Sequence, residues 1–182
     1  MQSTLTRRII TRPAVPSDAA ALARIHVRAW QAAYPGLVEP HVLLALSVRE
    51  HEHRWREILS GERGDNYTIV AELDGEVAGF CVVAAPSRDK DEPEGVAEIA
   101  AIYADPSAQG RGLGKALMHD AIASLGPEWH TLTVWTLAEN YRALAFYAAF
   151  GFKRDGSERT DDHWLVPDIR LRRQLGLAGT DR

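Results

Sequence analysis

The 182-residue sequence lacks the features of an exported or membrane-spanning protein. Its one cysteine, Cys81, excludes an internal disulfide and a cluster of thiolate metal ligands. No apolar run approaches the roughly 18 residues that a membrane-spanning helix needs, and residues 1–4 do not begin the apolar region of a signal peptide. We therefore expect a protein that neither crosses a membrane nor is exported, with the cytoplasm as its location.

A basic excess and a histidine-based metal motif are also missing. The chain has 21 Lys and Arg against 25 Asp and Glu, so its net charge is −4, whereas nucleic-acid binders usually present a basic face. None of its histidines has the His-Glu-x-x-His spacing of a zinc protease, and His51 and His53 fall in a charged segment that predicts a solvated helix face. We expect no bound metal and no nucleic-acid partner. Cys81, within apolar residues 80–83, is expected to be buried.

The elements can be predicted from periodicity and turn signals. The length suits one domain, residues 1–182 with a core at about 7–175, and no internal repeat is visible. Ser17-Asp18 and Ser47 are expected to cap helices, and Asp74-Gly75 predicts a hairpin. Strands are expected at 8–12, 67–71, 77–84, 98–104, 130–137, 152–155 and 164–171, and helices at 19–33, from 41, at 48–59, from the glycines near 112 to 125, and between 140 and 151.

This order of elements predicts an α/β (α+β) fold. The helix after the glycines must cross over from the central strand to a parallel neighbour at 130–137, while the other strands favour antiparallel pairing. We expect a mixed, mostly antiparallel sheet of about seven strands with helices on both faces. Residues 88–95 carry four acids and are expected to form a mobile, solvated loop, and the tail after Leu175 is expected to be loose.

The centre of the sequence is the stretch 98–115, an apolar strand followed by a loop with glycines at 110, 112 and 114 and then by a helical pattern. Glycines free the backbone amides, and a helix N-terminus attracts anions, so a phosphate cradle is predicted. A nucleotide P-loop is excluded because Gln109 and Ala116 stand where it needs glycine and Ser or Thr. The glycine spacing also fits a dinucleotide fingerprint poorly.

Two motifs instead resemble those of the GNAT superfamily of N-acetyltransferases. Residues 109–114 match Q-x-x-G-x-G, which is similar to that family's acetyl-CoA pyrophosphate loop, and residues 140–152 match N-x-x-A-x-x-F-Y-x-x-x-G-F. Both occur in the family's order, and the resemblance covers nearly the whole chain. It implies acetyl transfer from acetyl-CoA directly to a primary amine of a small molecule or peptide, without a metal. The alternative is a non-catalytic CoA-binding or CoA-sensing domain, and a homodimer is left open.

The resemblance implies two catalytic residues. Glu98 lies eleven residues before Gln109, where related enzymes place a general base, and a base is useful because an amine with a pKa near 10.4 is almost fully protonated at pH 7. The alternative is an exposed Glu98 at the strand end, paired with a cation. Tyr147 would protonate the leaving thiolate; otherwise it is an ordinary core aromatic. Asn140 shares its helix face and either contacts CoA or only caps the helix.

The remaining site residues follow from the same resemblance. Trp30, Tyr34 and the acid-rich segment 155–162 fall where the family builds its acceptor pocket, although Trp30 also suits a core position and the acids could simply be solvated. Phe146, with Phe150, also suits the core. The backbone of Ile102, Tyr103 and Ala104 would pair with the pantetheine arm, and the other expected CoA contacts are Gln109, Gly110, Arg111, Gly112, Leu113, Gly114, Lys115, Asn140, Ala143 and Phe146.

Overall fold

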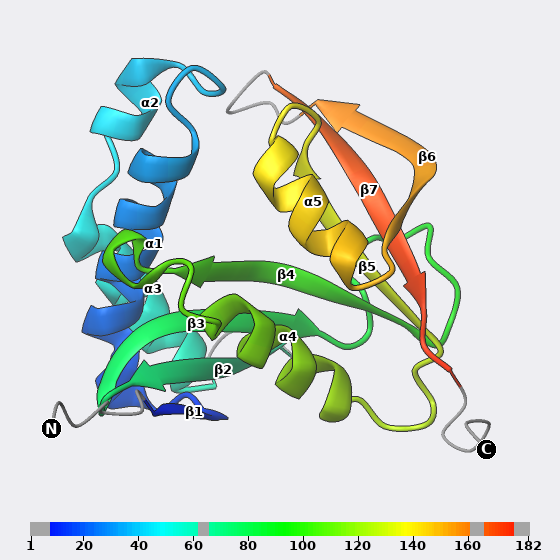
Figure 1. Ribbon diagram of the computed structural model, residues 1–182, viewed down its shortest axis with the longest axis horizontal. Coiled ribbons are helices and arrows are strands. Elements are labelled where there is room, and N and C mark those ends of the chain that lie inside the picture. Colours follow the sequence, from blue (N-terminus) through cyan, green and yellow to red (C-terminus); the bar gives the residue numbers. More distant parts are fainter. Residues whose placement is uncertain (1–7, 62–65, 161–165, 177–182) are drawn as a thin grey trace, which may run out of the picture.

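Seven strands form one mixed sheet in the computed structural model (Figure 1), which describes residues 8–61, 66–160 and 166–176. The strand order is β1-β2-β3-β4-β5-β7-β6, and every neighbouring pair is antiparallel except β4 and β5, which are parallel. The predicted fold class and the parallel crossover are therefore confirmed. The strands are β1 (Ile9–Pro13), β2 (Asn66–Leu73), β3 (Glu76–Ala84), β4 (Val96–Ala104), β5 (Thr131–Leu137), β6 (Lys153–Thr160) and β7 (Pro167–Gln174).

Helices cover both faces of the sheet, as expected. On one face Leu22 and Trp55, from α1 and α3, pack against Phe80, while on the other Leu117 and Tyr147, from α4 and α5, belong to the larger core. Neighbouring residues in the middle of β2 and β3 alternate between the two cores because strand side chains point alternately to opposite faces. The helices are α1 (Ala19–Ala33), α2 (Pro40–Leu44), α3 (Val48–Leu59), α4 (Leu113–Ala123) and α5 (Tyr141–Ala149).

The hairpin between β2 and β3 forms where Asp74-Gly75 predicts it. Both residues have positive φ, 55° and 91°, as a two-residue turn of the type favoured by hairpins requires. The Ser47 cap is also confirmed, because its side chain accepts a hydrogen bond from the Glu50 amide. Asp18 lies at the expected N-cap position of α1, but its side chain makes no cap hydrogen bond, and its carboxylate instead binds Arg12.

The two central strands stay together for only part of their length. A register shift sets Val82 opposite Ala101 and Val83 opposite Ile99, so Ala100 is an extra residue that bulges β4. β4 pairs with β5 only from Val96 to Ile99, and beyond that point the two strands separate (Figure 1). The outer half of β4 therefore has one backbone edge without a strand partner.

Two peripheral expectations are wrong. The loop at 88–95 is not solvated throughout, because the Glu92 carboxylate is only 3% exposed and binds Arg170 at 2.6 Å. β6 reaches Thr160, so most of the expected acid-rich loop is an edge strand, which carries Asp155. Three expectations lie partly or wholly outside the described residues: the turn at 61–65 between the helix at 48–59 and the next strand, the start of the last strand at Trp164, and the tail after residue 176. Within the described chain, no helix is long and apolar enough to cross a membrane.

Candidate functional site

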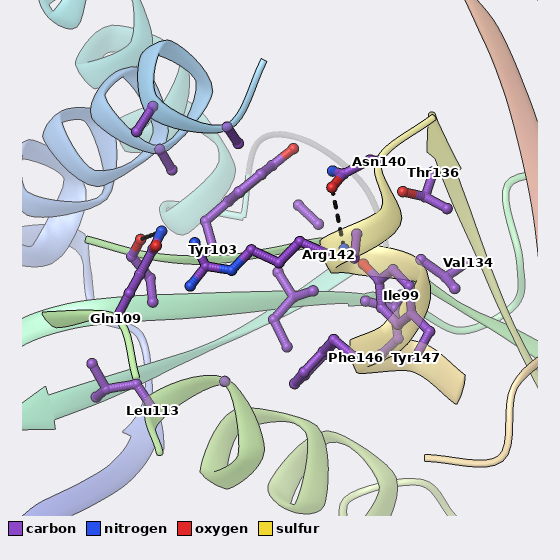
Figure 2. A pocket seen from close by; sticks show the side chains of 18 of the residues that line it. Ile99, Tyr103, Gln109, Leu113, Val134, Thr136, Asn140, Arg142, Phe146 and Tyr147 are labelled. Carbon is purple, nitrogen blue, oxygen red and sulfur yellow. Dashed lines mark hydrogen bonds between the residues drawn. The ribbon is translucent and has the colours of Figure 1, made fainter. Parts of the chain in front are cut away.

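A cavity of about 510 Å³ lies where β4 and β5 separate (Figure 2). Its walls come from the end of α1, the outer half of β4, the glycine loop, β5 and α5, so the cavity meets elements from both faces of the sheet. Most of the residues singled out from the sequence line it: Tyr34, Ile102, Tyr103, Ala104, Gln109, Gly110, Gly112, Leu113, Gly114, Lys115, Asn140, Ala143, Phe146 and Tyr147.

The described part of the acid-rich segment, residues 155–160, does not line the cavity, nor do three single residues that the sequence assigned to the site: Glu98, Arg111 and Trp30. Arg111 is exposed in the glycine loop. Trp30 packs in an aromatic cluster, with ring centroids 5.7 Å from His26 and 5.0 Å from Tyr34, which matches its alternative interpretation as a core residue. The sequence also missed part of the lining, namely Ala29, Ala32, Ala33, Ile99, Ala100, Ala101, Ala108, Val134, Trp135, Thr136 and Arg142.

The glycine loop has the backbone geometry of an anion site. Gly110 and Gly112 have φ of 74° and 92°, values that side chains beyond glycine rarely adopt. The seven successive amides from Gln109 to Lys115 donate no hydrogen bond to any described residue, and the first amide of this region with a backbone acceptor is that of Ala116. These unsatisfied donors at the start of α4 fit a phosphate group.

Other contacts hold this loop against the rest of the site. The Gln109 side chain lies 3.5 Å from the Ala104 carbonyl and so ties the loop to the end of β4. A Cβ on Gly114 would come within 3.3 Å of the Phe146 ring, so this glycine lets α4 approach α5. Phe146 lines the cavity and also packs on Tyr147 and Phe150, at 5.4 and 5.1 Å between ring centroids. Both suggested roles for Phe146 are thus compatible with its position.

Helix α5 brings Asn140 and Tyr147 to the cavity. The Asn140 side chain accepts a hydrogen bond from the Ala143 amide at 3.1 Å, so it caps the helix. Tyr147 is 7% exposed, and its hydroxyl has no hydrogen-bond partner within the described part of the chain. Burial raises the pKa of Tyr147, so the hydroxyl keeps its proton at neutral pH and has that proton to donate.

Two further tyrosines face the cavity from the side of α1. The hydroxyls of Tyr34 and Tyr103 lie 3.5 Å apart, at the limit of a hydrogen bond. Burial raises the pKa of both phenols, so both are neutral near pH 7. This end of the cavity therefore presents uncharged hydroxyls beside the methyl groups of Ala29, Ala32 and Ala33.

Glu98 is occupied elsewhere. Its side chain is only 2% exposed, and its carboxylate accepts hydrogen bonds from the Arg88 guanidinium, with the Arg88 Nε at 3.2 Å, and from the Arg88 amide at 3.0 Å. The ion pair suggested by the sequence is therefore present, but its expected place at an exposed strand end is wrong. The structure does not bring this carboxylate to the cavity with Tyr147.

Trp135 forms a fixed part of the cavity wall that sequence reasoning did not find. Its indole N–H donates to Asp89 at 2.7 Å, and the Arg159 guanidinium lies 4.1 Å from its ring centroid. Asp89 also binds Arg170, whose side chain is 8% exposed. The loop at 88–95 thus fastens the β5 wall rather than moving freely in solvent.

Comparison with known proteins finds similarity to N-acetyltransferases. The sequence model of the Acetyltransferase (GNAT) family matches residues 23–152. An uncharacterised N-acetyltransferase of Mycobacterium tuberculosis is 31% identical over 163 residues, which cover 84% of this chain and 99% of the relative.

Solved structures share the fold. The PaiA N-acetyltransferase of Thermoplasma acidophilum, in complex with coenzyme A, has a TM-score of 0.72 at 18% identity and covers 92% of this chain and 99% of its own. The YncA putative acetyltransferase of Salmonella typhimurium, with its cofactor acetyl-CoA, has a TM-score of 0.63 at 17% identity. The match covers 96% of this chain and 98% of the YncA chain.

Proposed function

Because the chain belongs to the GNAT family of acetyltransferases, we propose that it transfers an acetyl group from acetyl-CoA directly to a primary amine of a small molecule or peptide. The observation that carries this proposal is the cavity at the separation of β4 and β5, with the glycine loop and its free amides on one side and Tyr147 in its wall. A second substrate can approach the same cavity from the side of α1, where Tyr34 and Tyr103 lie.

The donor half of the cavity suits the phosphate and amide groups of acetyl-CoA. The free amides of residues 109–115 supply donors for the pyrophosphate. The unpaired edge of β4, at Ile102, Tyr103 and Ala104, supplies donors and acceptors that match an extended chain of amides such as the pantetheine arm. These groups come from the backbone, so their positions depend on the fold of the strand and loop rather than on side-chain identity.

Tyr147 is proposed as the general acid. In the transfer, the amine nitrogen forms a bond to the thioester carbonyl carbon, and the carbon–sulfur bond breaks. The buried phenol can donate its proton to the departing sulfur, while the proton lost by the amine passes to water, which returns one to the phenol. Since the Glu98 carboxylate is held by Arg88 outside the cavity lining, water is the better candidate for the base.

The test compares Tyr147→Phe with the unchanged protein. We expect turnover to fall by about 100-fold, the lower end of the usual effect of a general acid, while the dissociation constant for acetyl-CoA changes little because the ring remains. Turnover is measured as thiol release over a panel of amines and peptides, and binding by calorimetry. Tyr141→Phe is the control, because Tyr141 begins the same helix and is 74% exposed.

The alternative, a non-catalytic CoA-binding domain of the same fold, gives a different result. Such a protein would bind acetyl-CoA in both variants yet release no thiol above background with any amine. Equal turnover in Tyr147→Phe and the unchanged protein would instead keep the activity and remove Tyr147 as the acid.

A further inference from the structure

Two helices begin at the cavity, and both carry a cation where helix electrostatics disfavour it. Lys115 lies in the first turn of α4 and Arg142 in the first turn of α5, and neither first turn contains an acid. The N-terminus of a helix is the positive end of its dipole, so acids are favoured there and cations are not. Both residues line the cavity, so two helix N-termini and two cations contribute positive potential to its wall.

Neither cation is neutralised by a carboxylate. Arg12, Arg88 and Arg170 each bind at least one acid, whereas Lys115 and Arg142 form no ion pair with any described residue. Exposed cations elsewhere, such as Arg49, also form no ion pair with a described residue, so the feature that distinguishes Lys115 and Arg142 is their place in the cavity wall. The pattern fits a ligand that brings more than one negative charge.

Arg142 lies on the side of the cavity opposite the glycine loop, where it can contact a bound ligand. It follows the cap residue Asn140, and its exposed side chain lines the cavity. Figure 2 shows this side chain extending from α5 across the cavity, toward the part of the view where Tyr103 and Gln109 lie. A guanidinium presents a planar set of donors that matches a phosphate and binds it with two parallel hydrogen bonds.

We infer that Arg142 binds the diphosphate of the acyl-CoA donor from the α5 side, opposite the amides of residues 109–115, and so selects phosphorylated donors over bare thioesters. This inference rests on the proposed function, because it takes acetyl-CoA as the donor. Arg142 occupies a variable position of the motif that begins at Asn140, which is why the motif alone does not reveal it.

The experiment pairs two variants with three ligands. Dissociation constants are measured by calorimetry, by displacement for weak ligands, with acetyl-CoA, its 3′-dephospho form and S-acetylpantetheine, which has no phosphate. The variants are Arg142→Gln and the control Arg49→Gln. Arg49 is the second residue of α3, as Arg142 is of α5; it is exposed, does not line the cavity, and therefore reports any general effect of removing a cation from a first helical turn.

For Arg142→Gln we expect the affinity for acetyl-CoA and for its dephospho form to fall by about 10- to 100-fold, the usual effect of losing hydrogen bonds to a charged group. The affinity for S-acetylpantetheine should not change, and Arg49→Gln should change none of the three. An equal loss with all three ligands, or no loss with acetyl-CoA, would overturn the inference. A loss confined to acetyl-CoA would overturn the assignment to the diphosphate. If the unchanged protein bound no acetyl-CoA, the proposed function itself would fail.

Discussion

At the scale of single residues, Glu98 has the sequence position of a general base but forms a buried ion pair with Arg88 instead. Removing a carboxylate from water is costly unless charged donors replace the lost hydration. Arg88 provides those donors from its side chain and its own amide, and Ser87 Oγ lies 3.4 Å from the same carboxylate. The pair therefore joins the first part of the β3–β4 connection to β4 itself.

Replacing Glu98 by Gln tests this role. The amide cannot satisfy the guanidinium as the carboxylate does, so we expect a loss of about 2–3 kcal/mol in the free energy of unfolding, typical of hydrogen bonds to charged groups. Urea unfolding measures that loss. The pH–rate profile with one amine should stay parallel to that of the unchanged protein, because no base has been removed.

Glu94→Gln serves as the control, since Glu94 is an exposed acid of the loop at 88–95 that also contains Arg88. A defect of Glu98→Gln that disappears at high pH, where the amine loses its proton unaided, would restore Glu98 as the general base.

Sequence spacing located Glu98 on the central strand but not its partner. Arg88 lies in a loop that looks solvated because its acids and bases are close together in sequence, whereas in the fold those acids bind arginines of β7 about 80 residues away. Trp135 could not be found from the sequence for the same reason. It has the pattern of an ordinary strand residue, and its contact with Asp89 exists only in the folded chain. Local pattern predicts the elements, and ion pairs between distant segments depend on how the elements are arranged.

At the scale of elements, His26 marks the contact of α1 with α3 and the sheet. Its ring lies 4.8 Å from His51 and 5.2 Å from Tyr103, between ring centroids. Burial, with smaller contributions from the charges of His51 and Arg54, lowers the pKa of His26 to about 3. The imidazole is therefore neutral in the folded protein over the ordinary pH range.

This shift predicts that acid destabilises the fold. In the unfolded chain His26 takes up a proton as the pH falls below about 6.5, whereas in the folded chain it does so only near pH 3. The unfolded state binds more protons between these values, so the contribution of His26 to stability is complete above pH 6.5 and is lost as the pH falls. The slope approaches about 1.4 kcal/mol per pH unit.

His26→Phe should remove most of that slope in urea unfolding at pH 7, 6 and 5. His53→Gln, at a position on α3 where the side chain is 75% exposed, should retain it. An unchanged slope in His26→Phe would assign the acid sensitivity to other groups.

The elements themselves were largely predictable because they obey local rules. The helix from Ala19 to Ala33 and the hairpin at Asp74-Gly75 follow from periodicity and turn chemistry. β6 was predicted too short because it is an edge strand of polar and charged residues, so it has no apolar alternation. The far wall of the cavity, at Ala29, Ala32 and Ala33, has only methyl side chains and so gives no signal in the sequence, and the separation of β4 and β5 opens the space beside it.

At the scale of the whole molecule, acetyl-CoA should stabilise the fold. A ligand that binds only the folded state contributes about 2.7 kcal/mol at a hundredfold excess over its dissociation constant. For a protein of this size that corresponds to a rise in Tm of roughly 5–10 °C. Gly112→Val should abolish the rise, because its φ of 92° strains any side chain and the loop amides would lose their arrangement.

Gly75→Val separates ligand binding from strain. Gly75 has nearly the same φ, 91°, but lies in the β2–β3 turn away from the cavity. Its variant should unfold at a lower temperature and still respond to acetyl-CoA. A full response in Gly112→Val would remove the loop from the binding site.

The two outer strands of the sheet limit how the protein can associate with itself. β1 has five residues and ends at Pro13, and β6 is charged along its length, with a break in register between Arg154 and Glu158. Proline, charges and irregular register all hinder the addition of a further strand to an exposed edge. Growth of the sheet from one molecule to the next is therefore blocked at both ends, which protects the chain from ordered aggregation and leaves helical surfaces, rather than strand edges, for any stable pairing of subunits.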